Sequence, residues 1–105
     1  MIEVDENLNI FYSVGDTFNL EIEPEDNETF TTGSTLQVII AQSEEIDTSI
    51  IDKTINLSDG KFTVTLTSSE IEKLKMGEYV YKMKYISGGK TITQISGNFT
   101  VKWGA

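Results

Sequence analysis

Carboxylates are the side chains of this sequence best suited to chemistry, because they gather in two short polar stretches. The acids of the two stretches are Glu23, Glu25, Asp26 and Glu28, and Glu44, Glu45 and Asp47. Carboxylate oxygens are ligands that Ca²⁺ prefers, but neither stretch has the spacing of an EF-hand loop. We therefore expect solvated loops without a bound metal ion.

Most other catalytic chemistry lacks its usual side chains here. The 105-residue chain has no histidine and no cysteine, and its eight basic residues are all lysines. This removes the commonest general base, thiol nucleophiles and thiolate metal ligands. A carboxylate pair for glycoside hydrolysis would need two acids across a deep cleft, which a small β domain rarely provides. The sequence predicts a protein that is not an enzyme and has no catalytic residues and no cofactor.

The charge of the chain is divided unevenly. Residues 1–52 carry thirteen acids and no base, whereas residues 53–105 carry four acids and eight lysines, for a net charge of −9. Binding of nucleic acid relies on clustered basic residues, so nucleic acid is not an expected partner. Two interpretations stay open. Strands from the two halves could pair so that acids and lysines cancel locally, or an acidic face of one subunit could meet a lysine face of the next in a homo-oligomer.

The length and hydropathy of the chain indicate one domain, spanning residues 1–105, without a membrane segment. About 100 residues suffice to bury a core without disulfides or metals. No apolar run approaches the roughly 18 residues that a membrane helix needs. The first six residues are acidic where a signal peptide would be basic. We expect synthesis in the cytoplasm and no membrane partner.

Alternation of apolar and polar residues with a period of two predicts an all-β protein. About seven strands are expected, over residues 9–12, 17–23, 35–41, 50–57, 62–66, 78–86 and 91–103. Asp59-Gly60 and Gly88-Gly89 are typical of hairpin turns. Thr67 and Glu70 have the spacing of a capping box, which predicts a short helical turn over residues 68–75. Gly97 interrupts the last strand and predicts a bulge or a bend there.

The segment from Gly77 to Tyr81 is the most informative in the chain. A turn followed by Gly-x-Tyr-x-Tyr is typical of the corner of an immunoglobulin-like antiparallel β-sandwich, in which a tyrosine hydroxyl bonds back to upstream backbone. We assign these structural places to Gly77, Tyr79 and Tyr81. Tyr79 is expected to make that hydrogen bond, and Tyr81 is expected to fill the core.

Several apolar residues fall where a strand pattern does not account for them. Phe30 stands alone in a polar loop, so it either tucks under the loop or meets a partner, and Ile39 points outward from a strand that should be covered or central. Phe30, Ile39 and Trp103 are therefore candidate interface residues. Tyr12 and Tyr85, near the ends of their strands, are expected at the surface with Trp103.

The order of motifs from Leu57 to Val101 resembles small immunoglobulin-like modules of tailed-phage virions. It comprises an Asp-Gly hairpin turn, a strand ending in Thr-Ser-Ser-Glu, a short helix, Gly-Glu-Tyr-Val-Tyr, a Gly-Gly turn and Gly-Asn-Phe-Thr-Val. Gly15-Asp16-Thr17-Phe18 is similar to the opening strand of such modules. The family includes the N-terminal domain of baseplate upper proteins and related short tail or head-fibre proteins.

The resemblance implies a non-catalytic structural component of a virion that docks other virion proteins, often as a trimer or hexamer. An alternative is a β-sandwich module that binds carbohydrate or a cell surface. The first hypothesis predicts an oligomer or a flat apolar patch, and the second predicts a monomer with exposed aromatic residues lining a groove.

Overall fold

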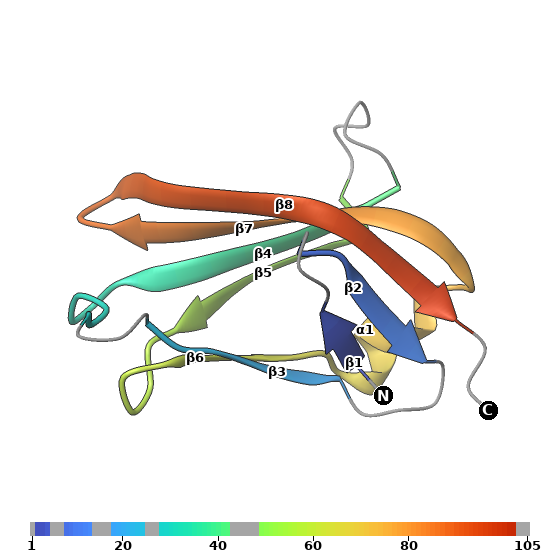
Figure 1. The fold of residues 1–105 in the computed structure, drawn as a ribbon, viewed down its shortest axis with the longest axis horizontal. Helices are drawn as coiled ribbons and strands as arrows, with labels where there is room; N and C mark the ends of the chain where they lie inside the picture. Colours follow the sequence, from blue (N-terminus) through green and yellow to red (C-terminus); the bar gives the residue numbers. More distant parts are fainter. Residues whose placement is uncertain (1, 5–7, 14–17, 25–27, 43–48, 103–105) are drawn as a thin grey trace.

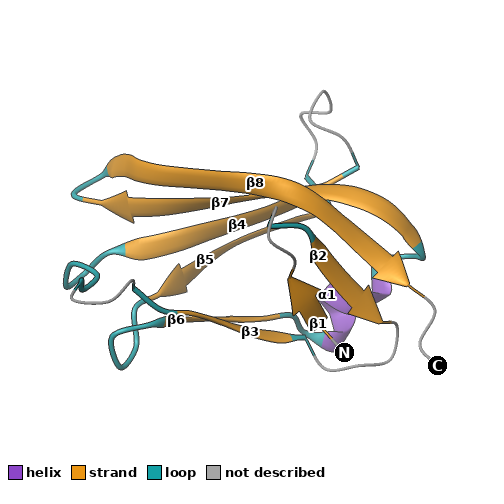
Figure 2. Cartoon of the chain, viewed as in Figure 1, coloured by secondary structure: helices purple, strands orange, loops and turns teal. Residues whose placement is uncertain are grey.

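The computed structural model describes residues 2–4, 8–13, 18–24, 28–42 and 49–102, and for residues 2–4 it describes the backbone alone. It is an all-β protein with one short helix (Figures 1 and 2). The elements in chain order are β1 (Ile2–Val4), β2 (Ile10–Ser13), β3 (Asn19–Ile22), β4 (Thr35–Ala41), β5 (Ile51–Asn56), β6 (Phe62–Thr65), α1 (Ser68–Glu72), β7 (Gly77–Ser87) and β8 (Lys90–Lys102).

The strands form two sheets that face each other across the core. The larger sheet has the order β1-β2-β8-β7-β4-β5, and the smaller consists of β3 and β6. In Figure 1 the β3–β6 pair lies beneath the long strands of the larger sheet. The buried apolar residues of both sheets belong to one cluster, which includes Phe18, Phe62 and Val64 from the small-sheet side and Val38, Ile40, Tyr81 and Met83 from the large sheet.

Two features of this architecture differ from the sequence prediction. The structure describes eight strands rather than about seven, because β1, three residues long in an acidic segment, has too little alternation to be recognised. The large sheet is mixed rather than antiparallel, since β2 runs parallel to β8, from Ile10 opposite Phe99 to Ser13 opposite Lys102. A parallel pair needs no tight turn, so no local signal announces it.

The parallel pairing also corrects the placement of Tyr12. We expected it at the surface, but it is 1% exposed. Residues two apart share a face of a strand, so Tyr12 points to the core with Ile10. Its ring packs 5.7 Å from that of Phe18 and 6.4 Å from that of Phe99. Burial raises the pKa of its hydroxyl.

The two predicted hairpin turns, at Asp59-Gly60 and at Gly88-Gly89, are confirmed. At the β5–β6 turn Asp59 and Gly60 both have positive φ, and Ser58 bridges to Lys61. Gly88 and Gly89 also have positive φ and join β7 to β8. Both central residues of a type I′ hairpin turn need this conformation.

The helical turn is confirmed too, although α1 ends at Glu72. The Thr67 hydroxyl accepts from the Glu70 N–H, and a Glu70 carboxylate oxygen accepts from the Thr67 N–H. Leu74 is buried and Ile71 packs against the core, as their spacing predicts.

Glu70 joins the helix to the large sheet through an ion pair with Lys53 of β5, 2.8 Å from Nζ to Oε1. Burial alone would raise the pKa of the Glu70 carboxyl, but hydrogen bonds from Lys53 and Thr67 outweigh it and lower the pKa. A carboxylate whose pKa is lower in the folded than in the unfolded chain stabilises the fold at neutral pH. That stabilisation is lost as pH falls from the unfolded value, about 4.3, through the folded one.

We therefore expect the variant Glu70→Gln to lose less unfolding free energy than the wild type when pH is lowered from 7 to 3. Urea unfolding at a series of pH values would measure it. Glu72→Gln, an exposed site on the same helix, is the matched control. If the unfolding free energy of Glu70→Gln fell with pH as much as that of the wild type, the ion pair and the cap would not contribute to the pH dependence of stability.

The hydroxyl of Tyr79 makes the bond to upstream backbone that the sequence predicts. It donates to the Lys75 carbonyl at 2.9 Å and accepts from the Lys75 N–H at 3.0 Å. Tyr81 is 2% exposed within the core, and its hydroxyl donates to the Leu8 carbonyl. Gly77, with φ of 146°, opens β7 in a conformation that favours glycine.

Replacing Tyr79 by Phe removes both bonds to Lys75, and we expect it to lower the unfolding free energy by about 1–2 kcal/mol. Urea unfolding would measure this loss. Tyr85→Phe, which removes the bond from the Thr31 N–H at a more accessible hydroxyl, should cost less and serves as the control. Equal stability of Tyr79→Phe and the wild type would contradict a structural role for this hydroxyl.

Candidate functional site

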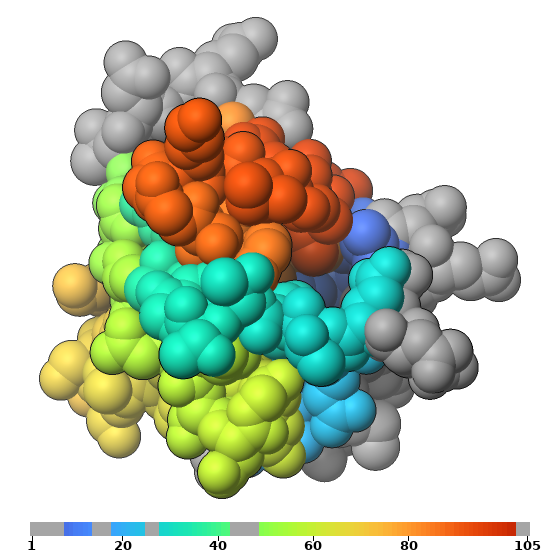
Figure 3. All heavy atoms as spheres, turned by 90° about the vertical axis from the view of Figure 1, so that its left-hand side faces the viewer, coloured from blue at the N-terminus to red at the C-terminus, as the bar shows by residue number. Residues whose placement is uncertain are grey.

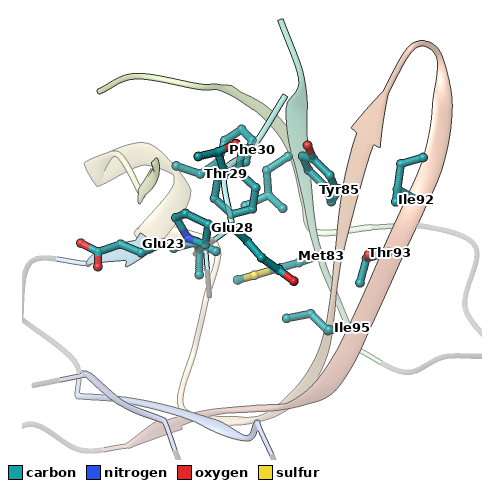
Figure 4. A pocket seen from close by; sticks show the side chains of 13 residues that line it. Glu23, Glu28, Thr29, Phe30, Met83, Tyr85, Ile92, Thr93 and Ile95 are labelled. Carbon is teal, nitrogen blue, oxygen red and sulfur yellow. The ribbon is translucent and has the colours of Figure 1, made fainter. Parts of the chain in front are cut away.

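An open, mostly apolar cleft of about 380 Å³ lies between the two sheets, near the end where the β7–β8 hairpin turns. This volume is at the lower end of the range for ligand pockets, about 300–1,000 Å³. Figure 4 shows most of its side chains. The lining residues are Ile22, Glu23, Pro24, Glu28, Thr29, Phe30, Leu36, Phe62, Met83, Tyr85, Ile92, Thr93 and Ile95.

Three aromatic rings form one wall of the cleft. Phe30 lies 4.8 Å from Phe62 and 5.2 Å from Tyr85 between ring centroids, and Phe62 and Tyr85 are 6.1 Å apart. Of the two alternatives for Phe30, the structure shows that it tucks in, half-buried against the core. Figure 3 shows residues 28–35 (turquoise) between the β7–β8 hairpin above and the β5–β6 turn below.

The hydroxyl of Tyr85 fixes the chain segment that carries Phe30. It accepts a hydrogen bond from the Thr31 N–H at 2.9 Å, and interactions with the side chain and the backbone of Thr31, then with the Ser34 side chain, lower the pKa of Tyr85. Tyr85 was expected at the surface, but it is half-buried, with its ring packed against the core. The strand β7 and the 28–34 segment are thereby held together at the cleft.

A β-bulge in β8 adds an apolar residue to the lining of the cleft. Tyr85 pairs with Thr93 but the next residue, Ile86, pairs with Thr91, so Ile92 is the extra residue. Ile92 is 59% exposed and lines the cleft with Thr93 and Ile95. The bulge in this strand therefore lies at Ile92, and the register of β8 with β7 is unbroken at Gly97.

Gly97 has a different structural role from the predicted one. A Cβ atom built there would lie 2.6 Å from the Leu8 carbonyl oxygen and 3.0 Å from Cε1 of Tyr81. The glycine is needed because the backbone before β2 crosses β8 at this point, which is the other common reason for a glycine within a strand.

Two carboxylates lie at the rim of the cleft. Glu23 is close enough to Lys61 to raise the pKa of that lysine, after the larger effect of the Lys61 bond to Glu21. The Glu28 carboxylate has no hydrogen-bond or ion-pair partner among the residues that the structure describes. In Figure 4 its side chain extends over the cleft between Phe30 and Ile95.

The other candidate interface residues lie away from the cleft. Ile39 is half-buried on β4, which pairs with both β5 and β7 and is central as predicted. Its neighbours in register are Asp52 and Lys82. Trp103 lies outside the described residues, as do Gly15, Asp16 and Thr17 of the opening motif.

The acidic stretches do not come together as a metal site in the described part of the chain, where no group of three or more acids could hold an ion. The part of the chain that the structure describes does not include Glu25, Asp26, Glu44, Glu45 and Asp47.

No described helix has the length and apolar character to cross a membrane.

The ion pairs between charged side chains can be compared with the two interpretations of the uneven charge distribution. Within the described residues, Lys61 and Glu21 join the lysine-rich and acid-rich halves across 3.1 Å, whereas Lys53 and Glu70 both belong to the second half. Local cancellation between the halves therefore occurs at one described ion pair, and the second interpretation, an interface between subunits, stays open.

Sequence reasoning missed the cleft as a unit. Only Phe30, an aromatic residue in a polar loop, indicated the cleft in the sequence, because the residues facing it come from separate strands.

Comparison with known proteins gives no further information on the site, since no family model, curated protein or solved structure matches the chain.

Proposed function

We propose that the chain is an immunoglobulin-like module without catalytic activity that acts by docking to other proteins and by self-assembly. The observation that carries this proposal is the apolar cleft left open between the sheets. A contiguous apolar surface rimmed by polar groups is typical of an interaction site. The lining, which is mostly aliphatic and aromatic, favours a protein segment over a carbohydrate, which needs more hydrogen-bonding groups.

The strand arrangement supports the immunoglobulin-like assignment. The β3–β6 pair corresponds to strands B and E of such folds, and neighbouring β4, β7 and β8 correspond to C, F and G. Tyr79 lies near the start of strand F and bonds back to Lys75, as a tyrosine corner does.

The resemblance of residues 57–101 to tailed-phage modules supplies the proposed setting. We infer a tail, baseplate or head-fibre component located in the virion, with other virion proteins as partners and a trimer or hexamer as the assembled state. The outer face of the large sheet around Ile39 is the proposed contact between copies.

Light scattering coupled to size-exclusion chromatography, over a concentration series, tests the self-assembly. We expect a trimer or hexamer, and we expect Ile39→Lys to shift the mass toward the monomer. Ile55→Val, a conservative change on β5 that packs toward the core, is the control. A monomer at every concentration would contradict self-assembly.

A further inference from the structure

Strand β8 has a neighbour on both sides only near its end. It pairs with β7 along its whole length, but β2 covers only the part from Phe99 to Lys102. Among the described residues, Thr91 to Ser96 therefore have a paired strand on one side alone. Five of these six residues, all except Ile95, are exposed. Figure 1 shows this part of β8 as the outer strand of the sheet beside β7.

The backbone of this edge has groups ready to pair. The Asn98 N–H donates to Oδ1 of Asn9, on the side of β8 that faces away from β7. Backbone groups along a strand alternate in direction. The N–H groups of Ser96 and Gln94 therefore also point away from β7, toward the unoccupied side.

The sequence of this edge lacks charged residues and proline, two of the usual protections against strand addition, and the bulge at Ile92 is a third that it has. Native proteins place charges or proline on exposed edges. Thr91-Ile92-Thr93-Gln94-Ile95-Ser96 contains neither. By contrast, the edge strand β5 carries Asp52 and Lys53, and β3 carries Glu21. The bulge at Ile92 limits the regular part of the free edge to residues 93–96.

The cleft lies directly beside the same edge. Ile92 and Ile95 of β8 line it, and so do Ile22 and Pro24 of the β3 segment. A strand added about 4.8 Å from β8 would send alternate side chains toward the cleft and the others to solvent. The edge and the cleft thus describe one site that accepts an extended segment, through backbone bonds at the edge and apolar side chains in the cleft.

We propose that β8 accepts an added strand from a different protein, whose segment places apolar residues and one lysine or arginine at the alternate positions that face the cleft. The basic residue is assigned to the unpaired carboxylate of Glu28. A second copy of this chain is the poorer occupant, because it would bring the acidic rims of two clefts together, and like charges disfavour such an approach. The inference rests on the proposed docking function and identifies its surface and the chemistry of its partner.

Two synthetic eight-residue peptides test the proposal, both with serine at the four solvent-facing positions and valine at three of the four cleft-facing ones, the fourth being either lysine or glutamate. Amide hydrogen exchange and NMR titration of the whole chain would be measured with each peptide. We expect the lysine peptide to bind saturably, to slow exchange at Gln94 and Ser96, and to bind at least tenfold more tightly than the glutamate peptide.

Variants locate the site. Ser96→Pro removes an outward N–H from an edge position where proline is tolerated, and should weaken binding of the lysine peptide at least tenfold. Ser96→Thr, which keeps that N–H, should bind as the wild type does. Glu28→Lys should also weaken binding at least tenfold. Circular dichroism of each variant establishes that it is folded.

Several results would overturn the inference. These are no binding of either peptide to the folded protein, binding that Ser96→Pro leaves unchanged, and equal affinity for the two peptides. Sedimentation showing a dimer that Ser96→Pro abolishes would assign the edge to a second copy instead. The proposed function would survive any of these if light scattering still showed an assembly sensitive to Ile39→Lys, so the two failures are distinguishable.

Discussion

Replacing Phe62 by Ala should lower the unfolding free energy by about 3–5 kcal/mol, the usual cost of removing a buried aromatic ring. The side chain is fully buried and holds the cleft wall formed by Phe30 and Tyr85. Since small domains have about 5–15 kcal/mol of stability in total, this loss would leave the chain close to unfolding. Urea unfolding followed by circular dichroism would measure it.

Phe11→Ala is the matched control for that experiment. Phe11 is half-exposed on β2, where the Lys102 ammonium lies 4.5 Å from its ring centroid, so its loss should cost far less. Phe62→Leu, which leaves a smaller cavity, should fall between Phe62→Ala and the wild type and remain measurable if the alanine variant unfolds. A loss below about 1 kcal/mol in Phe62→Ala would contradict its place at the centre of the core.

Replacing Gly97 by Ala should cost about 2–4 kcal/mol, although it adds a single methyl group. The new Cβ would meet the Leu8 carbonyl oxygen at 2.6 Å, and backbone cannot give way as a flexible side chain does. Moving Leu8 would also break its hydrogen bond from Tyr81 and strain the one between Asn9 and Asn98. Overpacking costs about 1–3 kcal/mol, and a lost buried hydrogen bond about 1 more.

Amide hydrogen exchange gives the sharper measurement for this variant. We expect faster exchange in β1 and β2 than in β4 and β7, because the clash releases the N-terminal strands first. Ser96→Ala, next to Gly97 and exposed, should leave both stability and exchange unchanged. Wild-type behaviour of Gly97→Ala would mean that Leu8 can shift without cost.

The features that sequence predicted well are local. The bounds of β4 agree with the expected range, 35–41, because a run of alternating residues between two turns leaves little freedom. The turn at Asp59-Gly60, the capping box of Thr67 and the Tyr79 bond to Lys75 each depend on residues at most four positions apart.

What could not be predicted depends on distant parts of the chain. The direction of β2 and the burial of Tyr12 follow from its pairing with β8. The role of Gly97 follows from Leu8. The cleft needs β3, β7, β8 and the segment of Phe30 at once. Periodicity shows that a strand has an inner face, but not which strand lies beside it.

The parallel pairing of β2 with β8 has a consequence for the order in which the chain folds. The Asn9–Asn98 bond joins residues 89 positions apart, so strands far apart in the sequence meet in one sheet. Closing so long a loop carries an entropic cost that slows folding. During synthesis β2 leaves the ribosome well before the strand it pairs with, because the two are separated by most of the domain. The ring packing of Tyr12 and Phe18 on Phe99 can therefore form only after β8 has emerged from the ribosome.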